Sequence, residues 1–370
     1  MHKQLRIIIA GGGTGGHIFP AIAVAQAIQK IQPNAAILFV GANGKMEMEK
    51  VPQAGYKIIG LTIAGLNRSN MFKNWSLPFK LIKSFFQVQN IFKQFKPNAV
   101  FGVGGYSSFP VLKFAQTKHI STFIHESNAF AGKSNQWLGA KATKIFTGTT
   151  GMEVFFPAEK IQVTGNPVRQ NIIEAAYSKE AALLQFGLKP NRKTILIIGG
   201  SLGAASINKT VQEHLASFAN EAIQLIWQTG KPNAQAYVIS AKNYSNVFVN
   251  SFIDNMSAAY TAADIVVSRS GAMAVAEICI TGKPAVFVPY PFAAEDHQTF
   301  NAMQLVKEGA ALMVADKEVS IKLMPAILQI INDDILASQM QSKIKSLALL
   351  NADKVIAEAI INSVENSNSL

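Results

Sequence analysis

The stretch Gly11-Gly12-Gly13-Thr14-Gly15-Gly16-His17-Ile18-Phe19-Pro20 follows the apolar run Leu5–Ala10 and precedes a helical pattern at Ala21–Ile31. This order predicts a buried strand, a glycine turn and a helix. Glycines leave the main-chain N–H groups of such a turn accessible to an oxyanion, and the helix directs the positive end of its dipole to the same point. The stretch is therefore predicted to be a phosphate-binding loop, with His17 at its mouth as a group that can transfer a proton.

Apolar runs rich in β-branched residues alternate with helical patterns along all 370 residues, too many for one ordinary core. Continuous apolar strands separated by helices are typical of parallel sheets that are covered on both faces. We therefore predict an α/β fold with two doubly wound domains, divided near residues 164–169. The expected strands lie at residues 7–10, 37–40, 99–103, 122–125, 144–147, 194–198, 224–228, 247–251, 265–268 and 285–289.

Charge is unevenly placed along the chain, whose net charge is +12. Residues 1–170 hold 19 Lys and Arg against 5 Asp and Glu, whereas residues 171–370 hold 15 against 17. No residue from Lys50 to His125 is acidic, which indicates an anionic partner, either nucleic acid or anionic lipid. The single cysteine, Cys279, excludes an internal disulfide, and the sequence contains no Cys-His zinc cluster, as expected in a reducing cytoplasm. We expect neither a targeting signal nor a membrane-spanning segment.

A helix predicted over residues 76–96 has two apolar sectors. The first is expected to face the sheet and consists of Leu81, Phe85, Val88, Phe92 and Phe95. A soluble helix needs only one such stripe, so the second sector is predicted to be an interfacial membrane patch with lysines at the headgroups. The alternative is that it packs on a neighbouring helix or a dimer partner. The predicted patch consists of Phe72, Lys73, Trp75, Phe79, Lys80, Ile82, Lys83 and Phe86.

Two further motifs follow strands in the first half. A second glycine loop, residues 102–110, is expected at the same sheet edge as the first, where the two could jointly hold a diphosphate. The alternative is a turn that needs glycine only for packing. In His125-Glu126-Ser127-Asn128, Glu126 is predicted to orient an imidazole or accept from a sugar hydroxyl. The alternative is that Asn128 caps the next helix while His125 is satisfied in the core.

The second half repeats this chemistry. A third glycine loop at residues 199–204 adds the hydroxyl of Ser201, and Arg269 after a later strand is suited to pair with a phosphate. Glu277 lies on an otherwise apolar helix, where it is either on the solvent edge or accepts from a ribose diol. Residues 289–302 place Asp, His, Gln and Asn side chains beyond another strand.

Three phosphate-type loops, several diol-binding groups and no metal-ligand constellation indicate nucleotide-sugar chemistry. A dinucleotide-dependent dehydrogenase would need an acidic residue at the end of the second strand to hold the ribose. That strand ends Val40-Gly41-Ala42-Asn43, without an acid, which weakens the dehydrogenase interpretation.

Seven motifs occur in order: GGTGGHIFP at 12–20, GGYSSFP at 104–110, HESNAFAG at 125–132, GNPVR at 165–169, GGSLGA at 199–204, SRSGA at 268–272 and DHQTFNA at 296–302. Together they resemble the MurG family of bacterial glycosyltransferases, which add N-acetylglucosamine to lipid I in peptidoglycan synthesis. The resemblance implies a GT-B fold, with two Rossmann-like domains across a cleft. It implies an acceptor- and membrane-binding domain at 1–164 plus a C-terminal helix at about 350–370, and a donor-binding domain at 165–349.

The resemblance also implies residue roles for an inverting transfer that needs no metal and no cofactor. His17 is expected to be the catalytic base, with Glu126 as its competitor. The acceptor pyrophosphate would be held by Gly12, Gly13, Gly104, Gly105 and Tyr106. The main chain at Ile253 would read the uracil, Glu277 the ribose, and His297 and Gln298 the sugar hydroxyls. The other donor contacts would be Thr14, Gly15, Gly16, Asn128, Arg169, Ser201, Leu202, Gly203 and Arg269.

The partners implied are UDP-N-acetylglucosamine, undecaprenyl-pyrophosphate-linked lipid I, an anionic membrane surface and other proteins of cell-wall synthesis or division, with no nucleic acid. The expected location is the cytoplasmic face of the bacterial inner membrane, as a peripheral protein. Three alternatives stay open: a glycolipid synthase acting on a diacylglycerol, a metal-free UDP-N-acetylglucosamine 2-epimerase of the same fold, and a membrane-surface module that only senses a nucleotide.

Overall fold

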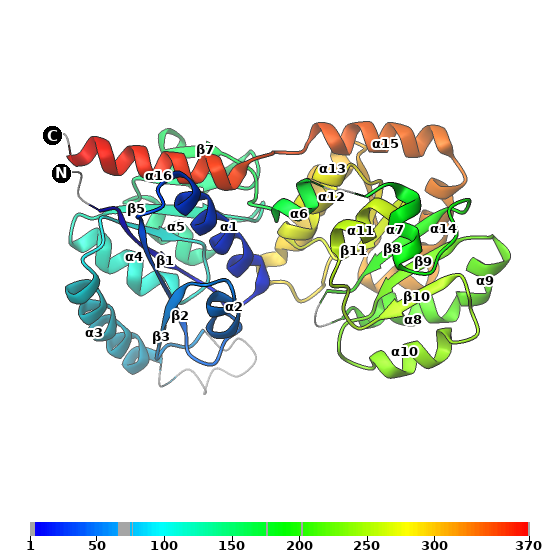
Figure 1. The fold of residues 1–370 in the computed structure, drawn as a ribbon, viewed down its shortest axis with the longest axis horizontal. Helices are drawn as coiled ribbons and strands as arrows, with labels where there is room; N and C mark the ends of the chain where they lie inside the picture. The colour runs from blue at the N-terminus through cyan, green and yellow to red at the C-terminus, as the bar shows by residue number, and fades with distance from the viewer. Residues whose placement is uncertain (1–3, 66–74, 76, 175–176, 201–202, 369–370) are drawn as a thin grey trace. The chain divides into compact units, whose positions relative to one another are not determined.

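The computed structural model describes residues 4–65, 75, 77–174, 177–200 and 203–368, and the chain forms two compact units (Figure 1). The first unit contains the chain up to Arg169 and again from Leu349 onward, and the second contains Gln170–Ala348. The chain therefore leaves the first unit at the end of the motif at 165–169 and returns to it for its last helix.

A seven-stranded parallel sheet forms the centre of the first unit, in the order β3-β2-β1-β4-β5-β6-β7. The order reverses between β1 and β4, which is the position where open α/β sheets bind ligands. The strands are β1 Arg6–Ala10, β2 Ala36–Ala42, β3 Lys57–Leu61, β4 Ala99–Gly102, β5 Ser121–Glu126, β6 Lys144–Thr147 and β7 Ile161–Val163.

Helices cover both faces of this sheet, because successive residues of the central strands point to opposite faces and are apolar on both. Ile7 and Ile9 of β1 belong to one core with α1 and α16, whereas Ile8 belongs to a second core with α3, α4 and α5. Figure 1 shows α16 lying along α1. The helices are α1 Gly15–Ile31, α2 Glu47–Gln53, α3 Leu77–Phe95, α4 Ser108–Thr117, α5 Lys133–Gly139 and α16 Ala352–Asn368, with short 3-10 helices η2 Met152–Val154 and η3 Ala158–Lys160.

The second unit repeats the arrangement with six parallel strands in the order β10-β9-β8-β11-β12-β13. Its strands are β8 Thr194–Ile198, β9 Gln224–Gln228, β10 Val247–Asn250, β11 Ile265–Ser268, β12 Ala285–Phe287 and β13 Ala311–Met313. Its helices are α6 Gln170–Ile173, α7 Lys179–Gln185, α8 Ala205–Glu213, α9 Leu215–Asn220, α10 Ala234–Ala241, α11 Met256–Ala262, α12 Ala272–Thr281, α13 His297–Lys307, α14 Val319–Ile331 and α15 Asp334–Ser346, with η4 Ala294–Asp296 and η5 Asp316–Glu318. The predicted fold class, two doubly wound α/β units with parallel sheets, is confirmed.

Two local predictions were wrong. Helix α1 begins at Gly15 rather than at Ala21, so the last glycines of the first loop form its first turn and carry His17 within the helix. On α3, Val88 and Phe92 are buried as predicted, but Leu81 is exposed, and Ser84 is buried in its place. The Ser84 hydroxyl donates to the carbonyl oxygen of Leu81 (2.6 Å), which satisfies this polar group inside the core.

Candidate functional site

The two glycine loops of the first unit lie against each other at the carboxyl ends of β1 and β4, which are paired up to Ala10 and Gly102. A Cβ on Gly11 would lie 2.6 Å from the carbonyl oxygen of Gly104, and one on Gly105 would lie 2.7 Å from that of Gly12. Both glycines also have positive φ angles, +142° and +82°. The loops therefore pack main chain on main chain, an approach that only glycine allows.

Glu47, at the start of α2, lies directly beneath the first loop. Its buried carboxylate accepts hydrogen bonds from the main-chain N–H groups of Gly13 (2.8 Å) and Ala42 (3.0 Å). A Cβ on Gly12 would lie 2.4 Å from this carboxylate. The Gly13 amide, predicted to face the acceptor pyrophosphate, is thus occupied by a side chain in this structure.

Sequence reasoning missed Glu47 because it looked for an acid at the end of the second strand itself. The available signal was that Glu47 and Glu49 are the last acids before the long stretch without any. Both Glu47 oxygens are held by main-chain amides, so the residue is not placed as a ribose acceptor. Glu47 therefore gives no support to a dehydrogenase.

His17 lies in the first turn of α1 and leans over the second loop. Its Nδ1 is 3.1 Å from the carbonyl oxygen of Gly12 and 3.4 Å from Thr14 Oγ1. Because a carbonyl oxygen only accepts, the neutral ring carries its hydrogen on Nδ1 and its lone pair on Nε2. Nε2 lies 3.1 Å from the position that a Cβ on Gly104 would occupy. The geometry thus directs the basic nitrogen toward the second glycine loop.

Glu126, the competing candidate for the base, is engaged at the end of β5. Its buried carboxylate accepts from Asn128 N (3.1 Å) and Nδ2 (3.3 Å), from Gly132 N (3.0 Å) and from Asn135 Nδ2 (2.9 Å). Four donors around one carboxylate hold the turn before α5 in place. Asn128 does not cap this helix, since Gly132 occupies the N-cap position. Asn135, which sequence reasoning missed, links Glu126 to the space beside Gly104.

His125 is fully buried beside this turn. Its Nε2 lies 3.3 Å from the carbonyl oxygen of Gly165, and its Nδ1 lies 3.3 Å from Ser127 Oγ. Burial lowers the pKa of His125 to about 4, against the opposing effect of the Gly165 carbonyl. His125 is therefore a neutral core residue at neutral pH, as its alternative interpretation predicts.

Tyr106 lies in the second loop, and Arg169 ends the first segment of the first unit. The ring of Tyr106 fills the space beside Gly65, where a Cβ would lie 2.9 Å from it. Burial, and then the charge of Glu47, raise the pKa of Tyr106. The guanidinium of Arg169 lies over the ring of Phe19 at 5.9 Å, which places this cation on the first turns of α1.

In the second unit, the third glycine loop lies at the carboxyl end of β8. Ser201 and Leu202 lie outside the described residues. A Cβ on Gly203 would lie 2.6 Å from the carbonyl oxygen of Thr229, so this loop also packs closely on a neighbouring main chain. Asn208 on α8 donates to the same carbonyl (2.8 Å) and thereby ties the helix to the loop.

Glu277 and Ile253 are both buried. Glu277 Oε2 accepts from the hydroxyl of Tyr260 (3.0 Å), so the alternative that this carboxylate lies on a solvent edge is wrong. The main-chain N–H of Ile253 donates to Gln228 Oε1 (3.3 Å). Their roles toward ribose and uracil stay predictions.

Arg269 belongs to an internal ion pair. One terminal nitrogen lies 2.5 Å from an Asp316 carboxylate oxygen and 3.1 Å from each of the carbonyl oxygens of Val288 and Pro289. The other lies 3.2 Å from Ser206 Oγ. A phosphate contact stays a prediction for Arg269, whose described hydrogen bonds join β11 to η5 and α8.

The start of α13 is held against the turn after β11. Ser270 Oγ donates to the carbonyl oxygen of Gln298 (2.8 Å), and Asn301 Nδ2 donates to that of Ser270 (3.0 Å). Gln298 Oε1 accepts from Tyr290 N (3.0 Å), and His297 Nδ1 lies 2.6 Å from the carbonyl oxygen of Ala294. These contacts position the first turn of α13 at the carboxyl edge of the sheet. In the part of the chain that the structure describes, no group of three His, Cys, Asp or Glu side chains could hold a metal.

The predicted membrane patch is exposed. Trp75 (79%), Phe79 (67%), Ile82 (56%) and Phe86 (65%) project from the α3 region, with exposed Lys83 beside them. The alternative that this sector packs on a helix of the same chain is wrong for these residues. Phe72 and Lys73 lie outside the described residues. Among the residues that the structure describes, no helix is both long enough and apolar enough to cross a bilayer.

The comparisons with known proteins cover the whole chain. The N-terminal domain of glycosyltransferase family 28 matches residues 7–147, and its C-terminal domain matches residues 194–359. A protein of Bacteroides thetaiotaomicron, named UDP-N-acetylglucosamine–N-acetylmuramyl-(pentapeptide) pyrophosphoryl-undecaprenol N-acetylglucosamine transferase, is 49% identical and covers 100% of both chains. A relative with the same name from Christiangramia forsetii is 44% identical over 99% of this chain and 100% of its own.

Solved structures with similar folds include a member of the same family of enzymes. The crystal structure of Acinetobacter baumannii MurG has a TM-score of 0.79 at 28% identity and covers 97% of this chain and 100% of its own. A UDP-GlcNAc 2-epimerase from Neisseria meningitidis, bound to UDP-GlcNAc, has a TM-score of 0.67 at 15% identity, over 97% and 100% of the two chains. This second likeness is one of fold alone.

Proposed function

Because the chain belongs to glycosyltransferase family 28, with full-length relatives that share nearly half of its residues, we propose that it is an N-acetylglucosaminyltransferase. It moves N-acetylglucosamine from UDP-N-acetylglucosamine to the N-acetylmuramyl-(pentapeptide) of a pyrophosphoryl-undecaprenol, converting lipid I to lipid II. The observation that carries the proposal is the 49% identity over the whole of both chains. The 2-epimerase alternative shares only the fold, and nothing favours a diacylglycerol acceptor.

The geometry of the first unit supports an acceptor site at the paired glycine loops. His17 Nε2 takes the proton of the acceptor C4 hydroxyl while that oxygen attacks the anomeric carbon of the donor, and UDP leaves from the opposite side with inversion. The hydrogen bond between Nδ1 and the Gly12 carbonyl supports this role, because it leaves Nε2 as the basic nitrogen. Glu126 acts on the same site by holding Asn128 and Asn135, since its own oxygens already accept four hydrogen bonds.

The donor belongs to the second unit in this proposal. The amides of the loop at 199–204 and the start of α8 stabilise the charge that develops on the leaving diphosphate. Glu277 accepts from the ribose and Gln298 from the sugar. Support comes from the burial of Glu277 and from the hydrogen bonds that hold the start of α13 at the same sheet edge.

The transfer assay uses the full chain, labelled UDP-N-acetylglucosamine and a lipid I analogue with a short prenyl chain. We expect label in a disaccharide product, and we expect His17→Ala to lower kcat by at least about 100-fold. The matched control is His119→Ala, which changes an exposed histidine that precedes β5, whereas the loops of the site follow the carboxyl ends of the strands. Turnover of the donor without an acceptor would instead identify an epimerase, and transfer only to a diacylglycerol would identify a glycolipid synthase.

The patch on α3 supports peripheral binding to an anionic membrane at the cytoplasmic face, where the prenyl-linked acceptor is located. Trp75→Ser with Phe79→Ser is expected to weaken binding to vesicles that contain phosphatidylglycerol. The control is Leu184→Ser with Ile239→Ser, two exposed apolar residues of the second unit. Equal vesicle binding by both variants would favour a dimer contact or a contact with another cell-wall protein.

A further inference from the structure

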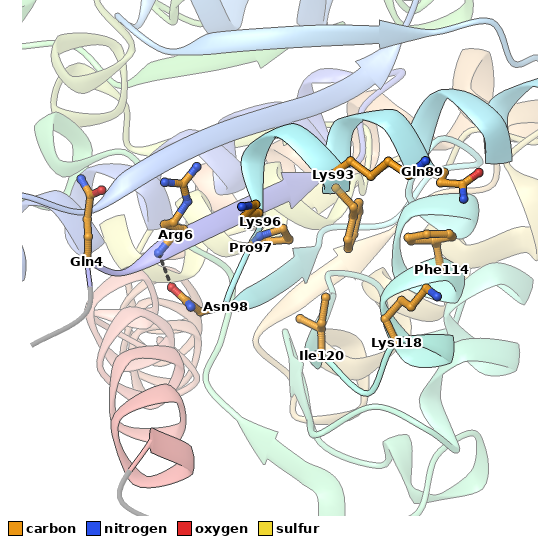
Figure 2. Close-up of a pocket in the computed structure, with 11 residues that line it drawn as sticks. Gln4, Arg6, Gln89, Lys93, Lys96, Pro97, Asn98, Phe114, Lys118 and Ile120 are labelled. Carbon is orange, nitrogen blue, oxygen red and sulfur yellow. Dashed lines mark hydrogen bonds between the residues drawn. The ribbon is translucent and has the colours of Figure 1, made fainter.

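A cavity lies in the first unit at the amino ends of the strands, opposite the glycine loops (Figure 2). It has a volume of about 650 Å³ and forms where β1, β4 and β5 begin and where α3 and α4 end. The glycine loops follow β1 and β4, whereas this cavity precedes them. It is therefore separate from the site that we propose for transfer.

Four cations line the cavity: Arg6, Lys93, Lys96 and Lys118. None of the described residues that line it is acidic. Within the described ranges, none of the four has a carboxylate partner, although most ion pairs in this chain involve lysine. The cavity thus concentrates positive charge that the protein itself does not neutralise.

Helix capping accounts for only part of this charge. The carboxyl ends of α3 and α4 point to this edge, and each carries about half a negative charge. The two ends offset about one of the four positive charges. Two of the last carbonyl oxygens already accept: that of Phe95 from Arg6 Nε (2.5 Å), and that of Phe114 from the main-chain N–H of Lys118 (3.2 Å). About three positive charges remain for a ligand.

Two aromatic side chains that contact each other line the cavity. The rings of Phe92 and Phe114 meet edge to face with centroids 5.0 Å apart, and Lys118 Nζ lies 5.9 Å from the Phe114 centroid. Arg6 is held by Asn98, whose Oδ1 accepts from Arg6 N (2.8 Å), as the dashed line in Figure 2 shows. A ligand here meets apolar ring edges and several cations at once.

We propose that this cavity binds a phosphate ester joined to an apolar group. Lysine and arginine recognise the phosphate, and the Phe92 and Phe114 rings contact the apolar part. The same helix, α3, carries the exposed patch at its other end, so the phosphate of a membrane lipid is one source of this chemistry and a soluble phosphate ester is the other. The site takes no part in the transfer chemistry, and its test needs no turnover.

The test is calorimetric titration of the full chain, saturated with UDP, with monomeric short-chain phosphatidylglycerol, with glycerol phosphate and with inorganic phosphate. We expect saturable binding of at least one probe, and Lys93→Gln with Lys118→Gln is expected to weaken it at least about ten-fold. Phe114→Leu is expected to weaken the binding of the lipid and to leave the binding of inorganic phosphate unchanged. Binding of the lipid alone identifies a headgroup, and equal binding of glycerol phosphate identifies a soluble ester.

The charge-matched control is Lys30→Gln with Lys57→Gln, two exposed lysines of the same unit that lie outside the cavity. An equal loss of affinity in both variants would reduce the effect to net charge and overturn the proposal. Absence of saturable binding by all three probes would also overturn it. So would a lower melting temperature of the cavity variant with unchanged affinity, because the lysines would then serve only the helix ends.

Discussion

Glu47 is the residue on which the first glycine loop rests, and its charge provides a direct test of that role. The carboxylate holds the N–H groups of Gly13 and Ala42, and after burial it is the second cause that raises the pKa of Tyr106. Glu47→Gln keeps the size but offers one acceptor and one donor, so one of the two N–H groups loses its partner. We expect the pKa of Tyr106 to fall toward its ordinary value and kcat to fall about ten-fold, the cost of one charge-assisted hydrogen bond.

The pKa is followed by NMR titration of labelled tyrosine, and kcat by the transfer assay. Glu49→Gln is the control. It removes the same charge only two residues away, and the Glu49 side chain is mostly exposed. An unchanged Tyr106 titration together with unchanged kcat would mean that Glu47 serves only to fill space beneath Gly12.

His125 gives the protein a pH-dependent stability. Its pKa is about 4 in the folded chain, against about 6.5 for an exposed histidine, so below pH 6.5 the unfolded chain binds a proton that the folded chain does not. Above pH 6.5 the free energy of unfolding keeps its full value. As the pH falls toward 4, it decreases by on the order of 3 kcal/mol.

Denaturant unfolding at a series of pH values checks this. We expect the free energy of unfolding of His125→Gln to fall less steeply over this range than that of the unsubstituted chain. His119→Gln, which changes an exposed histidine, is expected to keep the original slope. Parallel curves for all three proteins would show that His125 is not the group responsible.

Single residues also show what sequence reasoning reaches and what it misses. The positions of His17, Glu126 and Gly104 could be predicted, because each belongs to a motif at the carboxyl end of an apolar strand. The pairing of Glu47 with Gly13 could not, since the two residues lie 34 positions apart and no local pattern marks such a pair. The four donors around Glu126 could not be predicted for a similar reason. Their positions depend on the path of a turn, which local propensity does not determine.

At the level of elements, the contact between the two glycine loops depends on the missing Cβ atoms rather than on flexibility. Gly105→Ala would place its Cβ 2.7 Å from the Gly12 carbonyl oxygen, in addition to the cost of a positive φ. Gly44→Ala is the matched control, because Gly44 also has a positive φ, +69°, but has no atom within 4 Å of a Cβ.

We expect Gly44→Ala to destabilise the protein by about 1–2 kcal/mol, the cost of the left-handed conformation. Gly105→Ala is expected to cost clearly more, and to lower kcat as the loops separate. Denaturant unfolding and the transfer assay measure both effects. Equal losses of stability in the two variants would show that the loop-to-loop contact can relax without cost.

The elements that could be predicted are those with strong local patterns. Each of the ten predicted strands is present, because buried parallel strands are continuous apolar runs. The strands β3, β7 and β13 lie at sheet edges and were missed: β3 alternates with exposed Lys57 and Ile59, and the other two span three residues each. The early start of α1 was missed because glycine has a low helix propensity, which tertiary packing overrides here.

Across the whole molecule, the six strands of the second sheet follow the same spatial order as the first six of the first sheet. The repeated strand, glycine loop and helix made this duplication predictable. The return of the last helix to the first unit came only from the family resemblance, because nothing local in residues 352–368 indicates which core they complete. The apolar face of α16 is compatible with either sheet, and only the assembled core decides between them.

The position of α16 makes the stability of the first unit depend on the last residues of the chain. Ile356 and Ile360 are fully buried in one core with Ile7 and Ile28, which are more than 300 residues earlier in the chain. Ile360→Ala is expected to destabilise the protein by about 2–5 kcal/mol through the cavity it leaves. Ile335→Ala on α15, an exposed position of the second unit, is expected to change stability by less than about 0.5 kcal/mol.

Hydrogen exchange locates the effect of Ile360→Ala. The loss of amide protection is expected in β1, β2 and α1, with β8 and β9 unchanged. Protection lost equally in both sheets would instead mean that the two units unfold as one cooperative body.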